Sequence, residues 1–168
     1  MIKINSNISG FVTVRKMQSQ ITKYRIYDLE HEDLERIIEI ENESFITPWP
    51  REIFEMEFKL KRSYNKVCRD EQGVVTGYCL SWLIHDEIHI LKVAVDSKFR
   101  KKGIAGMLIT DTLEHFRSIG ANHAVLEVRT DNTSAISLYE KLGFEPVRIR
   151  RNYYRETGDD ALVMMLEF

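Results

Sequence analysis

A basic segment around one glycine, Arg100 to Gly106, carries residue types suited to binding a phosphate group. It follows the apolar run Ile88 to Val95 and opens a stretch with the spacing of an amphipathic helix. Gly103 allows the backbone to approach a ligand closely, and successive N–H groups at a helix start bind phosphate. The alternative is an ordinary turn between a strand and a helix, with solvated basic side chains. This segment alone is compatible with both.

Two further residues could move protons. Glu127 lies inside the apolar run 124–128, where a carboxylate is rarely placed without a partner or a task. Tyr139 lies close to two helical turns after Asn132, so the two share one helix face. We expect Glu127 and Tyr139 to flank one cleft. The alternatives are a Glu127 paired with Arg129 or another strand neighbour, a Tyr139 packed on the core, and an Asn132 that caps the helix.

The elements that must position these residues follow from periodicity and turn residues. Strands are predicted at 24–27, 64–69, 74–84, 88–95, 123–129, 145–151 and 161–168, and helices at 28–42, 51–60, 103–119 and 132–142. The second to fourth strands are joined by turns so short that they must pair antiparallel. The fourth and fifth enclose a helix, so they should run parallel. The sequence therefore predicts an α/β domain with a mixed sheet over 23–168, and a flexible extension or extra strand over 1–22.

Composition narrows the classes of partner. The 168 residues hold 24 basic and 26 acidic side chains, a net charge of −2, which gives no electrostatic case for nucleic acid or an anionic membrane. No apolar run has membrane-spanning length, and the first residues lack the apolar block of a secretory signal. Cys68 and Cys79 are expected to be buried and reduced, with a disulfide or a catalytic thiol as the alternatives. We expect a cytoplasmic protein.

Two segments taken together resemble the GNAT superfamily of acyl-CoA N-acyltransferases. Arg100–Ala105 is similar to its Arg/Gln-x-x-Gly-x-Gly/Ala pyrophosphate loop, with Ala105 where many members have glycine. Asn132–Phe144 is similar to its Asn-x-x-Ala-x-x-Leu-Tyr-x-x-Leu-Gly-Phe segment. Within the superfamily, the segments 126–129, 150–154 and 45–49 resemble protein N-terminal acetyltransferases, especially the ribosomal-protein alanine N-acetyltransferases.

The resemblance implies a single-domain GNAT fold, with a mixed, mostly antiparallel sheet, a splayed parallel strand pair and about four flanking helices. It implies acetyl-CoA as cosubstrate and no metal. The implied cofactor-binding residues are Val93, Ala94, Val95, Arg100, Lys101, Lys102, Gly103, Ile104, Ala105, Gly106, Asn132 and Tyr139. Glu127 matches the general base of the family and Tyr139 its general acid. The implied walls of the acceptor slot are Phe45, Pro48, Trp49, Tyr153 and Tyr154.

The implied acceptor is the free α-amine of a polypeptide, from a ribosomal protein or a nascent chain, in a direct ternary complex. Acyl transfer needs a neutral amine, and about a tenth of α-amines are neutral at pH 7 against well under about 0.1% of lysines. The alternatives are a lysine, polyamine or small amine as acceptor, or a non-catalytic acyl-CoA sensor. We expect no nucleic-acid or membrane partner, and a monomer or weak dimer.

Several polar groups have a second interpretation. His85 and His89 suggest a metal site, but no Cys/His cluster accompanies them. Glu41 and Glu43 could attract a cationic N-terminus, although a solvated helix face is the simpler interpretation. Tyr153 and Tyr154 could be a plain hairpin pair, and Phe45 and Trp49 could close a core edge. The arginines 148, 150 and 151 fit a solvated edge strand.

Overall fold

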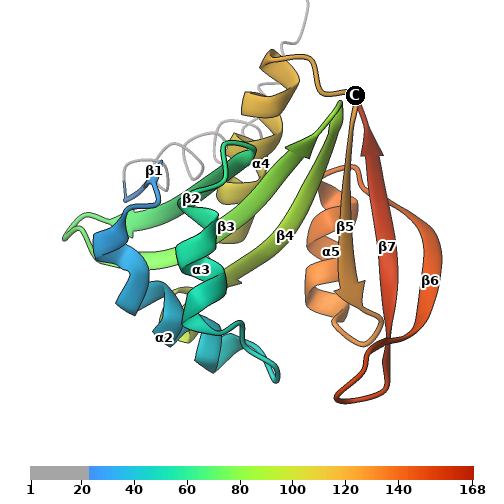
Figure 1. The fold of residues 1–168 in the computed structure, drawn as a ribbon, viewed down its shortest axis with the longest axis horizontal. Helices are drawn as coiled ribbons and strands as arrows, with labels where there is room; N and C mark the ends of the chain where they lie inside the picture. The colour runs from blue at the N-terminus through green and yellow to red at the C-terminus, as the bar shows by residue number, and fades with distance from the viewer. Residues whose placement is uncertain (1–22) are drawn as a thin grey trace, which may run out of the picture.

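The computed structural model describes residues 23–168, which form one seven-stranded sheet with helices on both faces (Figure 1). The predicted extension over 1–22 lies outside the described residues. The strands are β1 (Tyr24–Asp28), β2 (Ser63–Asp70), β3 (Val75–Ile84), β4 (Glu87–Val95), β5 (His123–Arg129), β6 (Glu145–Tyr154) and β7 (Asp159–Glu167). Their order in the sheet is β1-β2-β3-β4-β5-β7-β6. The β4–β5 pair is parallel and the other pairs are antiparallel, which confirms the predicted mixed sheet.

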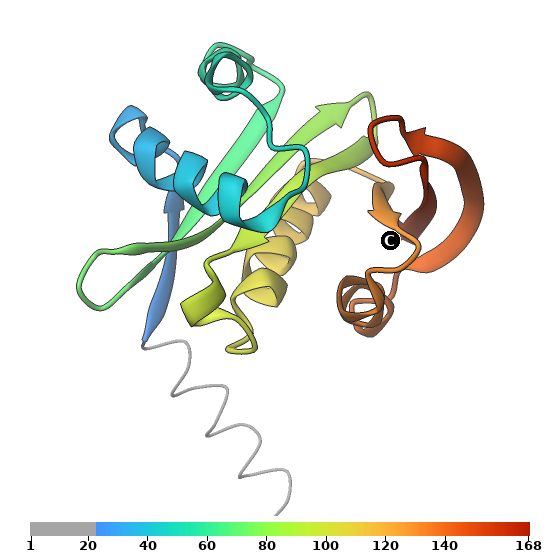
Figure 2. The same ribbon diagram turned by 90° about the horizontal axis from the view of Figure 1, so that it is seen from below.

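Within residues 23–168, four α-helices cover the two faces of this sheet. They are α2 (Leu34–Ser44), α3 (Arg51–Glu57), α4 (Ile104–Ser118) and α5 (Thr133–Lys141). The helices α2 and α3 lie on one face, and α4 and α5 on the other (Figure 2). Each face has its own apolar core, one built around α4 and one around α2 and α3. The α4 stripe Ile104, Leu108 and Ile109 is buried because its helical spacing turns these side chains toward the sheet.

The first predicted helix, 28–42, begins too early. Asp28 instead ends β1, where it pairs with Lys66 of β2. A short 3-10 turn, η1 (His31–Asp33), follows, and α2 begins only at Leu34. At Glu30 a capping box with Asp33 closes the start of this turn. Pairing in the sheet therefore keeps Asp28 in a strand, although the acidic residues of the segment had suggested the start of a helix.

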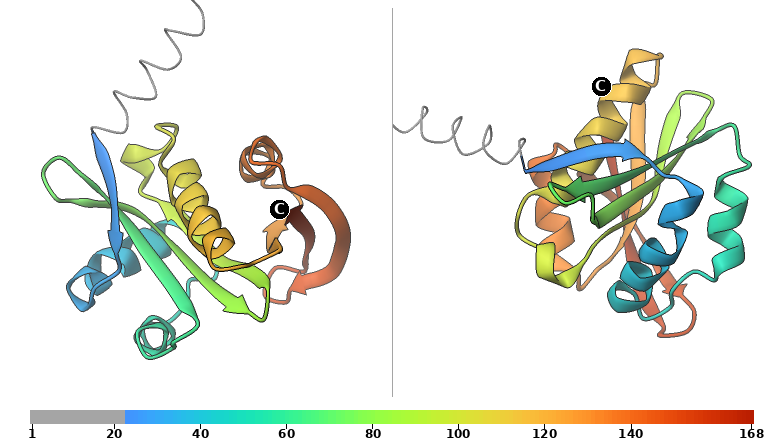
Figure 3. Two further views of the ribbon diagram at one scale, coloured as in Figure 1. Left: turned by 90° about the horizontal axis from the view of Figure 1, so that it is seen from above. Right: turned by 90° about the vertical axis from the view of Figure 1, so that its left-hand side faces the viewer.

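The two parallel strands separate partway along their length. Pairing between β4 and β5 covers only Glu87–Ile90 and 123–126. Beyond Ile90 the strands diverge, and α4 and α5 lie on either side of that divergence (Figures 1 and 3). The splayed pair implied by the resemblance is therefore present.

A β-bulge in β4 lies where the strands part. Opposite β3, Ile90 pairs with Ser81 and Lys92 pairs with Leu80, so Leu91 has no partner across the ladder. A bulge of this kind reverses the alternation of side chains beyond it. Ile90 and Val93 accordingly pack in the core under α4, whereas Leu91 packs in the core under α2 and α3.

Candidate active site

The backbone before α4 leaves several N–H groups free to bind an anion. Lys101 and Gly103 have positive φ angles of 60° and 82°, and Gly103 caps α4. No backbone hydrogen bond within residues 23–168 uses the N–H groups of 101–106. Consecutive free N–H groups at a helix start form a concave anion site, to which the helix dipole adds. The predicted phosphate segment therefore has suitable geometry.

The basic side chains of this loop do not all project from it. Arg100 donates to the Val95 carbonyl at 3.0 Å and to the Ser44 hydroxyl at 3.2 Å. The Lys102 ammonium lies 4.7 Å from the centre of the Phe99 ring. Anion contact here therefore falls first to the backbone amides.

The predicted pantetheine-binding residues, Val93 to Val95, lie on the part of β4 that has left β5. They pair with β3 on one side, where Val93 is opposite Cys79 and Val95 is opposite Gly77. On the other side, β5 no longer pairs with them. Backbone groups on that side are thus available to an extended ligand.

Glu127 lies on β5 just beyond the point of divergence. Its strand neighbours Leu126 and Val128 are buried under α4, so Glu127 points to the opposite face, and 33% of its side chain is exposed. Its partner is Arg150 of β6, whose guanidinium lies 2.7 Å from the carboxylate, and not Arg129. Arg129 instead contacts Asp159 and Thr157. Glu127 thus has a partner on β6, the strand beyond its neighbour β7, and also remains accessible.

Tyr139 reaches toward the same region from α5. Its ring packs on Phe144, with the ring centres 6.0 Å apart. Burial raises the pKa of its hydroxyl, and the nearby Cys79 thiol and Tyr154 hydroxyl raise it further. No residue among 23–168 hydrogen-bonds this hydroxyl. Tyr139 is therefore protonated at neutral pH, with its proton available to a ligand.

Asn132, predicted either as a cap or as a ligand contact, caps α5 in the structure. Its side-chain oxygen accepts the Ala135 N–H at 3.2 Å. This contact uses one acceptor position of the side-chain oxygen and does not involve the side-chain NH2 group.

Two tyrosines of β6 lie near Glu127. Tyr153 and Tyr154 meet edge to face, with their ring centres 5.1 Å apart. Burial raises the pKa of both hydroxyls, and Glu127 raises both further. The Arg150 guanidinium that pairs with Glu127 also lies 4.2 Å from the centre of the Tyr153 ring, so Arg150 and Tyr153 link Glu127 to Tyr154. Of the predicted wall residues, the two tyrosines therefore lie near Glu127, whereas Phe45 and Trp49 lie beside Lys92 of β4.

The loop after α2 is held by a buried carboxylate. Glu41 is 0% exposed, so its interpretation as part of a solvated helix face is wrong. It accepts the Trp49 N–H and the Lys92 ammonium, each at 2.7 Å, and the Tyr78 hydroxyl. Lys92 also lies 3.6 Å from the centre of the Phe45 ring. Phe45 and Trp49 are thus half-buried beside β4, whereas Pro48 is exposed.

Sequence reasoning missed Lys92 as a site residue. The signal was present, because Lys92 is a charged residue within the apolar run 88–95, as Glu127 is within its own run. What the sequence could not supply was its partner, which lies 51 positions earlier.

The comparisons with known proteins agree with this geometry. The model of the Acetyltransferase (GNAT) family matches residues 34–144. The chain belongs to the GNAT acetyltransferase family. The [ribosomal protein bS18]-alanine N-acetyltransferase of Escherichia coli (strain K12) is 31% identical over 143 residues, covering 84% of this chain and 95% of that protein.

Solved structures show the same fold for this GNAT chain. The crystal structure of the ribosomal-protein-S18-alanine N-acetyltransferase from Escherichia coli has a TM-score of 0.79 at 29% identity, covering 86% of this chain and 93% of that one. Ard1 from Thermoplasma volcanium has a TM-score of 0.80 at 27% identity, covering 86% and 97%. The chain is therefore an N-acetyltransferase related to protein N-terminal alanine acetyltransferases.

The cysteines and two of the histidines of this acetyltransferase have structural surroundings that account for them. Cys68 and Cys79 are free and buried, as expected. His89 and His123 share the carboxylate of Glu87, at 2.6 and 2.8 Å. Within the described part of the chain, no three such side chains are placed to hold a metal ion. Nor does any helix there combine the length and apolarity needed to cross a membrane.

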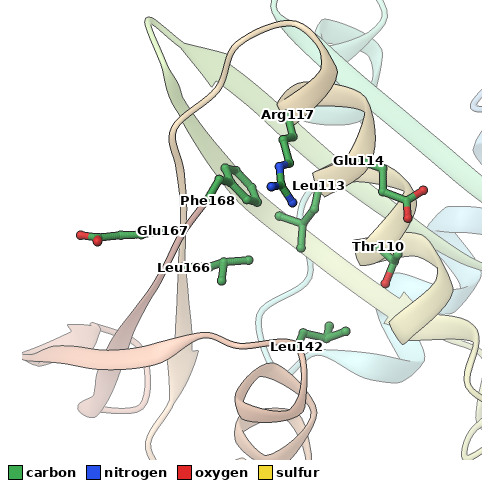
Figure 4. Close-up of a pocket in the computed structure, with 8 residues that line it drawn as sticks. All are labelled: Thr110, Leu113, Glu114, Arg117, Leu142, Leu166, Glu167 and Phe168. Atoms are coloured by element: carbon green, nitrogen blue, oxygen red, sulfur yellow. The ribbon is translucent and has the colours of Figure 1, made fainter.

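A hollow of about 470 Å³ lies at the other end of α4 from Gly103 (Figure 4). It is lined by Thr110, Leu113, Glu114, Arg117, Leu142, Leu166, Glu167 and Phe168. None of these is a predicted site residue. The hollow is separate from the divergence of β4 and β5, beside which Glu127 lies.

Proposed function

We propose that this GNAT enzyme transfers the acetyl group of acetyl-CoA to the free α-amine of a polypeptide N-terminus. The observation that carries the proposal is the divergence of β4 and β5, which leaves the backbone of 93–95 unpaired on the side of β5, the strand that carries Glu127. The polypeptide acceptor is supported by the relatives that are named ribosomal protein bS18-alanine N-acetyltransferases. An N-terminal alanine of a ribosomal protein or nascent chain is thus the first acceptor class to test.

The residues before α4 fit the pyrophosphate of acetyl-CoA. Within residues 23–168, the N–H groups of 101–106 have no other backbone acceptor, and the backbone of 93–95 faces the divergence. Acetyl-CoA supplies an activated thioester, so the chain need form no acyl intermediate. Burial of the Cys79 thiol, which raises its pKa to about 12, agrees with direct transfer.

Glu127 and Tyr139 then divide the proton transfers. The acceptor nitrogen attacks the thioester carbonyl carbon, and its surplus proton passes through a water to the Glu127 carboxylate. The Val93 amide stabilises the charge that develops on the carbonyl oxygen. As the carbon–sulfur bond breaks, the sulfur accepts a hydrogen bond or the proton from the Tyr139 hydroxyl. Because that hydroxyl has a raised pKa, it is protonated when the sulfur leaves.

The proposal is tested by thiol release from acetyl-CoA with short peptides that begin with Ala, Ser, Met-Leu or Met-Glu. Each peptide is offered with a free and with a blocked terminus, beside an internal-lysine peptide and spermidine. We expect turnover only where the α-amine is free. Turnover on lysine or spermidine alone, or binding of acetyl-CoA without turnover, would contradict the proposal.

The roles of the two residues are tested by Glu127→Gln and Tyr139→Phe. Each change should lower kcat by about 10²–10⁴-fold, the usual contribution of a positioned acid or base. In Glu127→Gln, which changes no residue of the predicted cofactor site, acetyl-CoA affinity measured by calorimetry should be unchanged. Tyr27→Phe, an exposed tyrosine on β1, is the matched control and should keep full turnover. Unchanged kcat in both variants would refute the assignment.

A further inference from the structure

The end of the Lys92 side chain lies in a site built to hold a cation. Its ammonium is 2.7 Å from the Glu41 carboxylate, 3.6 Å from the centre of the Phe45 ring and 5.1 Å from that of Trp49. A carboxylate together with aromatic faces is the arrangement by which proteins recognise alkylammonium ligands. Here a side chain of the protein itself occupies that place.

This cation site is fixed by other contacts. The Glu41 carboxylate is fully buried, and it also accepts the Tyr78 hydroxyl and the Trp49 N–H. These two donors would keep the carboxylate in place even without Lys92. The site is therefore pre-formed, and Lys92 fills it with only 11% of its side chain exposed.

The cation site borders the predicted acceptor slot. Because of the bulge at Leu91, Lys92 points to the face of α2, while the next residue, Val93, points to that of α4. Phe45 and Trp49, which cover the ammonium, are the predicted walls of the slot. Arg129 of β5 is near enough across the divergence to lower the pKa of Lys92, in addition to the larger effect of burial. Lys92 and Arg129, each paired with a carboxylate, thus border the predicted slot.

We propose that Lys92 is a specificity-determining residue that occupies this cation site and thereby excludes acceptors with a second positive charge near the reacting amine. The excluded class comprises polyamines and peptides with Lys as the second residue. A second cation would find the carboxylate and both rings already taken by Lys92. The inference rests on the proposed function, because it assumes that the amine acceptor enters beside Phe45 and Trp49.

Removing the side chain should open the site to an added cation. Lys92→Ala deletes three carbons and the ammonium, and propylammonium supplies the same atoms. We expect propylammonium to raise the Tm of Lys92→Ala, with no comparable effect on the wild type. n-Propanol, which has the same chain length but no charge, should not raise the Tm of Lys92→Ala. This readout requires no catalysis.

The same variant should change acceptor choice. Relative to a peptide with Ala at both first positions, kcat/KM for an Ala-Lys peptide should rise by about tenfold, the equivalent of one desolvated cation–aromatic contact. Spermidine should become a measurable acceptor. Propylammonium should reverse that rise by refilling the site. Lys92→Met keeps the apolar stem without the charge, so it should show the shift in acceptor choice but no response to propylammonium.

Lys66→Ala is the matched control. Lys66 pairs with Asp28 at 2.5 Å and lies 4.2 Å from the centre of the Tyr64 ring, the same chemistry on another part of the sheet. It should keep the wild-type acceptor ranking. If Lys92→Ala folds and neither responds to propylammonium nor changes its ranking, the inference is wrong. Should Lys92→Ala fail to fold, an unchanged ranking in Lys92→Met would reject it.

Failure of the proposed function would look different. In that case the wild type would not acetylate any free α-amine, whereas propylammonium would still raise the Tm of Lys92→Ala. Turnover on α-amines with an unchanged ranking in both Lys92 variants would reject the specificity role alone.

Discussion

Cys79 is the cysteine nearest the proposed chemistry, yet the structure makes it inert. It is fully buried on β3, and burial raises the pKa of its thiol to about 12. Only the thiolate attacks electrophiles, and with this pKa roughly 10⁻⁴ of the thiol is ionised at pH 8. The Cys79 thiol is therefore near Tyr139 because the two side chains pack together, and not because the thiol reacts.

This predicts resistance to alkylation. At about pH 8 native protein should lose no activity to iodoacetamide, and intact mass should show neither Cys68 nor Cys79 modified, since burial raises the pKa of Cys68 too. In denaturant both thiols of the chain should react. Rapid modification of Cys79 in the native protein, with loss of turnover, would show that the region opens or that the thiol takes part.

At the scale of elements, the start of α4 depends on one glycine. Gly103 has a φ of 82°, a left-handed conformation that costs an L-residue roughly 1–2 kcal/mol. Gly103→Ala should thus lower the free energy of unfolding by about that amount in urea. It should also weaken acetyl-CoA binding in calorimetry, because the adjoining N–H groups would be re-aimed.

Gly120 separates these two effects. It lies just after α4 with a φ of 98°, and a Cβ there would meet nothing within 4 Å. Gly120→Ala should therefore cost similar stability but leave acetyl-CoA affinity unchanged. Equal affinity in Gly103→Ala and the wild type would contradict a phosphate role for the loop.

Local pattern predicts elements well where one strand or helix face decides the matter. Strand β5 has the bounds that its alternation predicted, 123–129, and α5 begins beside its predicted cap, Asn132. The early start predicted for α2 is wrong because pairing between β1 and β2 is a tertiary contact. The Glu41–Lys92 contact escaped prediction for the same reason. Proximity across 51 positions is a property of the assembled sheet.

The molecule as a whole should lose stability in acid. Burial opposes ionisation of Asp96, but hydrogen bonds from the Lys98 N–H and the Arg36 guanidinium outweigh it, so its pKa lies below the usual value. Hydrogen bonds from Asn122 and from the Asn152 N–H lower the pKa of Asp86 and of Asp160. A carboxyl group whose pKa is lower in the folded than in the unfolded state stabilises the folded protein at any pH above its unfolded-state pKa. This contribution is lost as the pH falls through the folded-state pKa.

Urea midpoints should therefore fall as pH is lowered from about 4 toward 2.5, the range below the unfolded Asp pKa near 3.9. Asp96→Asn should flatten that decline, because the residue no longer titrates. Glu71→Gln, in the exposed turn after β2, changes net charge equally and should leave the decline intact. A parallel decline in Asp96→Asn and the wild type would exclude Asp96 as a contributor.

The unpaired Leu91 of β4 also bears on how such genes can diverge. Loss of one codon between those for Ile90 and Lys92 would remove the bulge and restore simple alternation. The side chains on one side of the deletion would then point to the opposite face of the sheet, either those toward Ile90 or those toward Val93. A change of length in the turn between β2 and β3 would not change the faces to which these side chains point. Lineages of this enzyme should therefore vary in length at 71–73, but keep the spacing from Ile88 to Val95 unchanged.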